Sequence, residues 1–144
     1  MNNEKDNVYD LVEDFYAHDE GWNTLLRQEY AEGFLRMEAW KGKKNSDLYR
    51  SWDNLTMLCL YLGSAETFLG DMNADDFIDC IAWCGRNISE FTPDYKNTQD
   101  FLETCDGLFK YLKGKNAISN DTVPATAAEI LLQEGKMNII LPDG

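Results

Sequence analysis

Residues 46–63 read SDLYRSWDNLTMLCLYLG, and their spacing indicates the fold class. Side chains suited to a core recur every three or four residues, as in an amphipathic α-helix. They are Tyr49, Trp52, Leu55, Thr56, Cys59 and Leu60. Ser46, followed by Asp47, carries a short oxygen-bearing side chain that can cap a first turn, so we expect the helix to begin there. Gly63 is its expected end.

The same spacing continues toward the N-terminus. Apolar residues at positions i, i+3, i+4 and i+7 predict a helix over residues 5–18. A second helix is expected over residues 23–41, opening at Asn23. Its end is marked by Gly42 and the lysines around it, because cations lie favourably near unpaired helix carbonyls. The expected buried stripes are Val8, Leu11, Val12, Phe15 for the first helix and Leu26, Tyr30, Phe34, Met37 for the second.

Two cap signals predict helices toward the C-terminus. Asn73 precedes a pair of aspartates, and negative charge is favoured in a first helical turn. Thr92 and Pro93 combine a cap residue with proline at the first helical position, which predicts a helix running to about Lys113. Residues 64–70, which follow the helix that ends at Gly63 and precede the cap at Asn73, are expected to form a connector or a single turn. The expected buried residues are Phe77, Ile78, Ile81, Cys84, Ile88, Phe101, Leu102, Cys105, Leu108, Phe109 and Leu112.

The chain is predicted to be one all-α domain. Its 144 residues suit a single core, and no repeat, low-complexity tract or linker divides them. Residues 1–121 are expected to form a compact bundle of five to six helices. Residues 122–144 are expected to add a short helix over 124–134 and an extended tail, Met137 to Leu141, laid on the same domain.

Charge and composition exclude several classes of function. Thirteen Lys and Arg against 26 Asp and Glu give a net charge of −13. This charge opposes binding to nucleic acid through phosphate contacts and docking on an anionic membrane. No secretory signal or membrane span is recognised, since the longest apolar run is Met57 to Leu62. Four cysteines in a domain of this size are read as reduced thiols, which favours a cytoplasmic location.

One acidic segment resembles a calcium loop. Asp71 to Asp79, DMNADDFID, places oxygen ligands at the first, third, fifth and ninth positions. Such a loop needs glycine at its sixth position and a bidentate carboxylate at its twelfth, where this chain has Asp76 and Ala82. We therefore interpret the segment as an acidic helix N-terminus capped by Asn73.

Cysteine and histidine are too sparse to predict catalysis. Cys80 and Cys84 lie four residues apart and could share a metal, but zinc takes four ligands, usually as two close pairs. Cys59 and Cys105 are isolated on apolar stripes, so all four thiols are expected in the core. Every nucleophilic dyad or triad would depend on His18, the single histidine. We expect no enzyme, no metal site and no cofactor.

The candidate interaction residues come from two basic stretches, residues 41–50 and 110–115, and from two tryptophans. If the stretches meet in space, the acidic body has one basic edge; two solvated helix ends are the interpretation we favour. Core filling is the expected role of each of the two tryptophans, with partial exposure at the edge of the core as the alternative; a pair of exposed ones would mark a binding face. The candidates are Trp40, Lys41, Lys43, Lys44, Arg50, Trp83, Lys110, Lys113 and Lys115.

About half of the chain, near residues 46–121, resembles the SAM-like N-terminal core-binding domain of tyrosine recombinases and phage integrases. The matching features are Asp76-Phe77 with Ile81, Thr98, Leu108 to Leu112, and Ile118 to Asn120, with Ser46, Trp52 and Leu55 upstream. The resemblance implies a SAM-like helical core and an association with DNA. The basic DNA-facing residues of that family are largely replaced by acids, and no catalytic Arg, His and Tyr set follows, so recombination is not expected.

Three functions follow as hypotheses. The leading one is a non-enzymatic domain that binds another macromolecule, most simply a protein. The second is an acidic inhibitor, an immunity-type partner or DNA mimic that occupies a basic site. The third, implied by the resemblance, is a DNA-associated helper that uses the two basic stretches. The sequence leaves the partner and the oligomeric state open.

Overall fold

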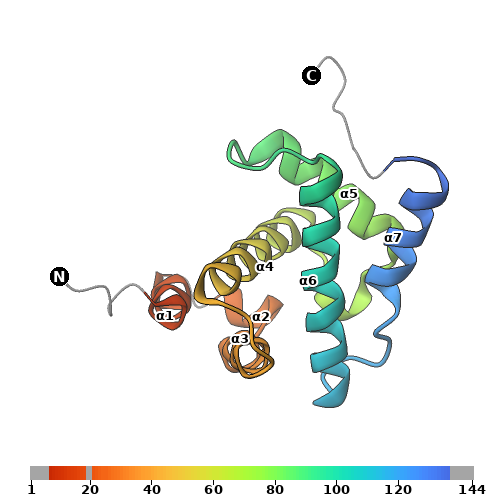
Figure 1. The fold of residues 1–144 in the computed structure, drawn as a ribbon. Coiled ribbons are helices and arrows are strands. Elements are labelled where there is room, and N and C mark those ends of the chain that lie inside the picture. Colours follow the sequence, from red (N-terminus) through yellow and green to blue (C-terminus); the bar gives the residue numbers. More distant parts are fainter. Residues whose placement is uncertain (1–6, 19–20, 137–144) are drawn as a thin grey trace.

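The computed structural model describes residues 7–18 and 21–136, which fold into seven α-helices and one 3₁₀ turn. The elements are α1 (Val8–His18), α2 (Trp22–Leu25), α3 (Gln28–Trp40), α4 (Asn45–Ala65), η2 (Leu69–Asp71), α5 (Ala74–Asn87), α6 (Tyr95–Gly114) and α7 (Val123–Gln133). In Figure 1, α4 and α6 cross at the centre, with α1 to α3 on one side and α5 and α7 on the other. The all-α prediction is confirmed.

Helix α4 is buried around most of its circumference, because α1, α2, α3, α5 and α6 all pack on it. Ten of its residues are buried, among them Leu58 and Leu62, which the expected stripe left out. Leu60, which the stripe included, is 39% exposed. One apolar stripe is the buried face of a helix at the surface of a domain. A helix surrounded by other helices buries residues on almost every face, so one stripe leaves some of its buried residues out.

The stripe of α1 is also shifted from its prediction. Val8 and Val12 are buried as expected, but Tyr16 completes the buried face in place of Phe15. Leu11 is 40% exposed. The buried residues therefore repeat every four positions, i, i+4 and i+8, which is the face that the helix turns toward α3 and α4.

The predicted helix over residues 23–41 is wrong, because it is broken into α2 and α3. Leu26 is extended at the break and its side chain is buried. The Tyr16 hydroxyl donates a hydrogen bond to the Leu26 carbonyl, and the Asn23 side chain accepts one from the Gln28 amide at 2.8 Å. Asn23 therefore supports the start of α3 instead of opening a helix itself.

Two predicted helix starts are also wrong. Helix α4 begins at Asn45, one residue before Ser46, and its cap position is Lys44, which makes no side-chain cap bond. Helix α6 begins at Tyr95, and its cap is Asp94, whose carboxylate accepts from the Asn97 amide at 2.9 Å. An aspartate cap satisfies an unpaired amide and adds favourable negative charge at the helix N-terminus.

The cap predicted at Asn73 is confirmed. Its side chain accepts from the Asp76 amide, and the Asp76 carboxylate accepts from the Asn73 amide, both at 2.9 Å. This reciprocal capping box satisfies two amides that the helix leaves unpaired. The acidic segment that resembles a calcium loop thus begins α5.

Replacing Asn73 with alanine is expected to lower the free energy of unfolding by about 1 kcal/mol, since the cap bond is lost. Urea unfolding followed by tryptophan fluorescence measures the change. Asn45→Ala is the matched control, because Asn45 is an exposed first-turn residue and is not itself a cap. An equal loss in both variants would contradict the assigned role of Asn73.

The short helix expected over residues 124–134 is α7, which packs on α5 and α6. Its buried side chains are Pro124, Ala127 and Leu131. The expected extended segment from Met137 to Leu141 lies outside the described residues. Among the residues that the structure describes, none of the helices combines the length and the apolar character needed to cross a bilayer.

Candidate binding surface

Trp40 is the last residue of α3, and its side chain is 89% exposed. The other three tryptophans are packed. Trp52 is buried, Trp22 stacks on Phe15 with ring centroids 4.7 Å apart, and Trp83 meets Tyr61 edge-on at 5.9 Å. The favoured prediction of core filling is therefore wrong for Trp40, whereas the half-buried Trp83 is part of a packed pair. Trp40 stands out because an indole of this size is rarely left in water.

Backbone hydrogen bonds hold the main chain of the turn after α3, which follows Trp40. Gly42 adopts a φ of 105°, a region that favours glycine. The Gly42 amide donates to the Ala39 carbonyl at 3.0 Å and the Lys43 amide to the Glu38 carbonyl at 3.1 Å. This pair of bonds is a Schellman motif, which closes a helix C-terminus with a fixed backbone. Residues 40–44 are named the Trp40 turn below.

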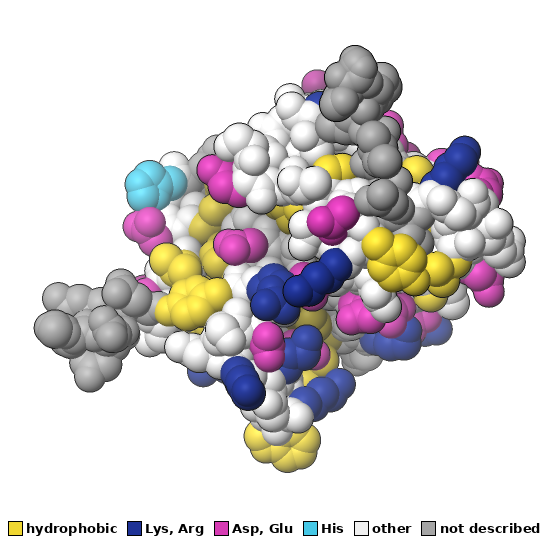
Figure 2. Space-filling model, turned by 45° about the horizontal axis from the view of Figure 1, so that its top comes forward, with side chains coloured by type: hydrophobic (Ala, Val, Ile, Leu, Met, Phe, Trp, Pro, Cys, Tyr) yellow, Lys and Arg dark blue, Asp and Glu magenta, His cyan; other side chains and the backbone are white. Residues whose placement is uncertain are grey.

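The lysines of the Trp40 turn differ in their partners. Lys43 pairs with Glu38 at 3.3 Å, and the Glu38 side chain is largely buried. Lys41 and Lys44 are exposed and form no ion pair with any residue that the structure describes. Arg50, a turn and a half further on, pairs with Asp47 at 3.7 Å. Figure 2 shows Lys and Arg side chains gathered on one part of the visible face, with single acidic side chains between them.

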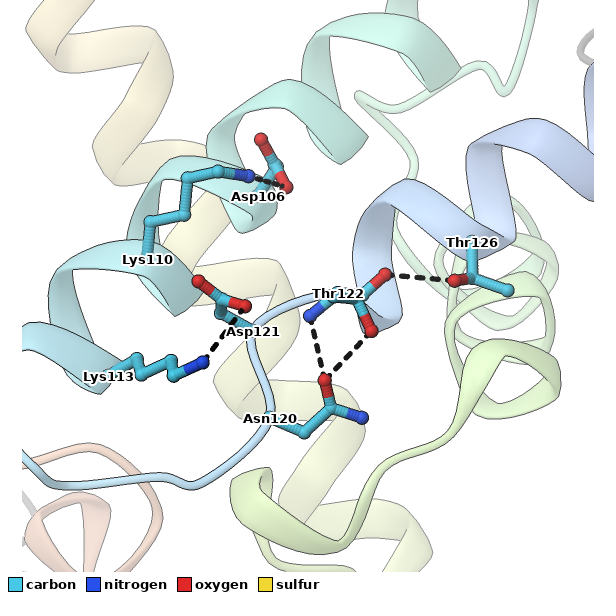
Figure 3. A network of polar contacts seen from close by, with 7 residues as sticks. All are labelled: Asp106, Lys110, Lys113, Asn120, Asp121, Thr122 and Thr126. Carbon is cyan, nitrogen blue, oxygen red and sulfur yellow. Dashed lines mark hydrogen bonds and ion pairs between the residues drawn. The ribbon is translucent and has the colours of Figure 1, made fainter.

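Each lysine of the second basic stretch has a contact, and one of them reaches the connection between α6 and α7. Lys110 pairs with Asp106 at 2.7 Å, Lys113 reaches Asp121 at 3.8 Å, and Lys115 lies over the Tyr111 ring. Figure 3 shows the two ion pairs beside the bonds from Thr122 to the Asn120 side chain, which order the chain before α7. These lysines therefore have structural partners, unlike Lys41 and Lys44.

An open pocket lies along α4, with a cavity volume of about 480 Å³. It is called the acid-rimmed pocket below. Its apolar lining is Met57, Leu60, Ile88 and Phe91, and its polar lining is Arg50, Asp53, Asn54, Thr56, Glu90, Asn97 and Asp100. The spacing of apolar residues could not predict it, because its walls come from α4, α6 and the connection between α5 and α6.

A buried amide organises one wall of this pocket. The Asn54 side chain donates to the Asp100 carboxylate at 3.0 Å and to the Thr104 hydroxyl at 2.9 Å. Buried polar groups are costly unless they are bonded, so this network holds α4 against α6. Nearby, partial burial raises the pKa of the Asp53 carboxyl above its ordinary value.

All four cysteines are buried, as expected. Burial raises the pKa of the Cys59 thiol to about 12, and it raises the pKa values of Cys80 and Cys105 well above their ordinary range. Thiols in this state are protonated and unreactive. Within residues 7–18 and 21–136, no group of three or more His, Cys, Asp or Glu side chains is arranged to hold a metal ion.

No protein-family model matches this chain, and no curated protein or solved structure matches it either. The resemblance of residues 46–121 to integrase core-binding domains stays a prediction.

Proposed function

We propose that this protein is a non-enzymatic domain that binds another protein through the Trp40 turn. The observation that carries the proposal is the 89% exposed indole of Trp40 on a backbone held by the Schellman motif. Exposed aromatic side chains on a fixed backbone lose little entropy on binding, and tryptophan is enriched among residues that dominate binding energy.

The surroundings of Trp40 indicate the chemistry of the partner surface. Lys41 and Lys44 follow the indole in the same turn. Both are exposed and form no ion pair with the described residues, so their charges can interact with a partner. An apolar cleft bordered by acidic side chains would complement this arrangement. The net charge of −13 disfavours a nucleic acid as the partner, because the acidic body repels phosphates.

Replacing Trp40 with alanine is expected to weaken the partner complex by at least about 2 kcal/mol, roughly 30-fold in Kd. The tagged chain is used to capture protein from the host lysate after nuclease treatment. The captured protein is then purified, and its Kd is measured for the wild type and for Trp40→Ala.

Phe68→Ala is the matched control, because Phe68 is another aromatic residue, 60% exposed, on a different part of the chain. The control should bind with the wild-type affinity. The double variant Lys41→Glu, Lys44→Glu should slow association, and the difference should shrink at high salt. Equal affinities for Trp40→Ala and the wild type, or capture that nuclease abolishes, would contradict the proposal.

A further inference from the structure

The acid-rimmed pocket combines apolar side chains and carboxylates in one lining. Met57, Leu60, Ile88 and Phe91 form the apolar part of the lining. The charged part of the lining consists of the carboxylates of three residues and one guanidinium, that of Arg50. The carboxylates belong to Asp53, Glu90 and Asp100. A ligand that fits must offer aliphatic surface and positive charge together.

Arg50 offsets part of this negative charge, but the three carboxylates outnumber its single guanidinium. Its guanidinium lies 3.7 Å from the Asp47 carboxylate, one turn before the pocket on α4. Asp100, by contrast, is held by the buried Asn54 amide. A carboxylate with a fixed orientation loses less entropy when it accepts a hydrogen bond from a ligand.

We propose that the acid-rimmed pocket binds a basic side chain, arginine or lysine, of a partner protein. The aliphatic stem contacts Leu60 and Phe91, and the charged head reaches Asp53 and Asp100. Long basic side chains are suited to this use because they bury their methylene groups while the charge stays at the opening. This proposal rests on the proposed function in one respect only: both assume that the partner is a protein.

The test titrates the full chain with n-butylguanidinium chloride at constant ionic strength and follows methyl and amide signals by NMR. We expect saturable shifts of Leu60 and Ile88 with a Kd of about 1 to 10 mM, in line with a ligand of this size. n-Butanol, which has the stem without the charge, should bind about tenfold more weakly. Guanidinium chloride, which has the charge without the stem, should also bind more weakly.

Variants locate the binding. Asp53→Asn and Asp100→Asn should each weaken n-butylguanidinium binding about fivefold or more, since each removes one charge. Glu13→Gln removes an exposed carboxylate of α1 and should leave the Kd unchanged. The absence of saturable shifts, equal binding of n-butanol, or equal Kd values for the aspartate variants and the wild type would overturn the proposal.

The two proposals fail separately. If n-butylguanidinium does not bind but Trp40→Ala still weakens the partner complex, the pocket assignment alone is wrong. If n-butylguanidinium binds as expected and Trp40→Ala has no effect, the role of the Trp40 turn alone is wrong.

Discussion

Replacing Phe77 with alanine is expected to lower the free energy of unfolding by about 3 to 5 kcal/mol. Phe77 lies in the first half of α5 and is fully buried. Its ring meets Phe109 of α6 edge-on, with centroids 5.4 Å apart. The alanine variant loses the buried ring, leaves a cavity between α5 and α6, and ends this aromatic contact. Because domains of this kind have about 5 to 15 kcal/mol of stability, the variant should be close to unfolding.

Urea unfolding, followed by far-ultraviolet circular dichroism, measures this loss. Phe77→Leu should lie between the alanine variant and the wild type, since it retains most of the apolar volume. Phe68→Ala removes the same number of atoms from an exposed site and should change stability by less than about 0.5 kcal/mol. A loss below about 1.5 kcal/mol for Phe77→Ala would show that Phe77 does not lie in the core.

The protein is also expected to lose stability steeply above pH 9. Burial raises the pKa of the Cys59 thiol from 9.0 to about 12. The pKa values of Tyr16 and Tyr61 are also raised, chiefly by burial. Each tyrosine donates its hydroxyl proton to a neighbour, Tyr16 to the Leu26 carbonyl and Tyr61 to the Asp79 carboxylate. The folded state therefore favours the protonated form of all three groups.

The sign of the pH dependence follows from these shifts. Below pH 9 the thiol is protonated in both states, and its contribution to stability is complete. As the pH rises from 9 toward 12, the unfolded chain releases the Cys59 proton while the folded chain keeps it, so unfolding becomes easier. Cys59 alone should remove about 2 to 3 kcal/mol between pH 9 and pH 11. The tyrosines should add to this loss above pH 10.

Urea unfolding at a series of pH values from 7.5 to 11 provides the measurement. Cys59→Ala should be less stable than the wild type at pH 7.5 because of the lost packing. Between pH 9 and pH 11, its free energy of unfolding should nevertheless fall less steeply than that of the wild type. The difference between the two slopes should be about 1.4 kcal/mol per pH unit. A wild-type free energy of unfolding that stays constant up to pH 11 would be incompatible with buried, protonated thiols and phenols.

Local patterns predicted the helices and some of their ends. The capping box at Asn73 lies within four residues, and all six apolar side chains expected to be buried in α6 are buried. Helix α6 packs on its neighbours mainly along one face, so the spacing of its apolar residues matches the buried face. The exposure of Trp40 was not predicted, because most tryptophans fill a core and the sequence does not show which neighbours an indole at a helix end will meet.

The remaining features depend on contacts between residues distant in the sequence. The break at Leu26 is stabilised by Tyr16 of another helix, and the exposed position of Leu60 follows from the helices that surround α4. The acid-rimmed pocket brings together residues that lie as far apart in the sequence as Arg50 and Asp100. Its charge depends on ion pairs such as that of Arg50 with Asp47. Helical periodicity is a local property of hydrophobic burial, whereas pockets and ion pairs arise from the arrangement of helices in space.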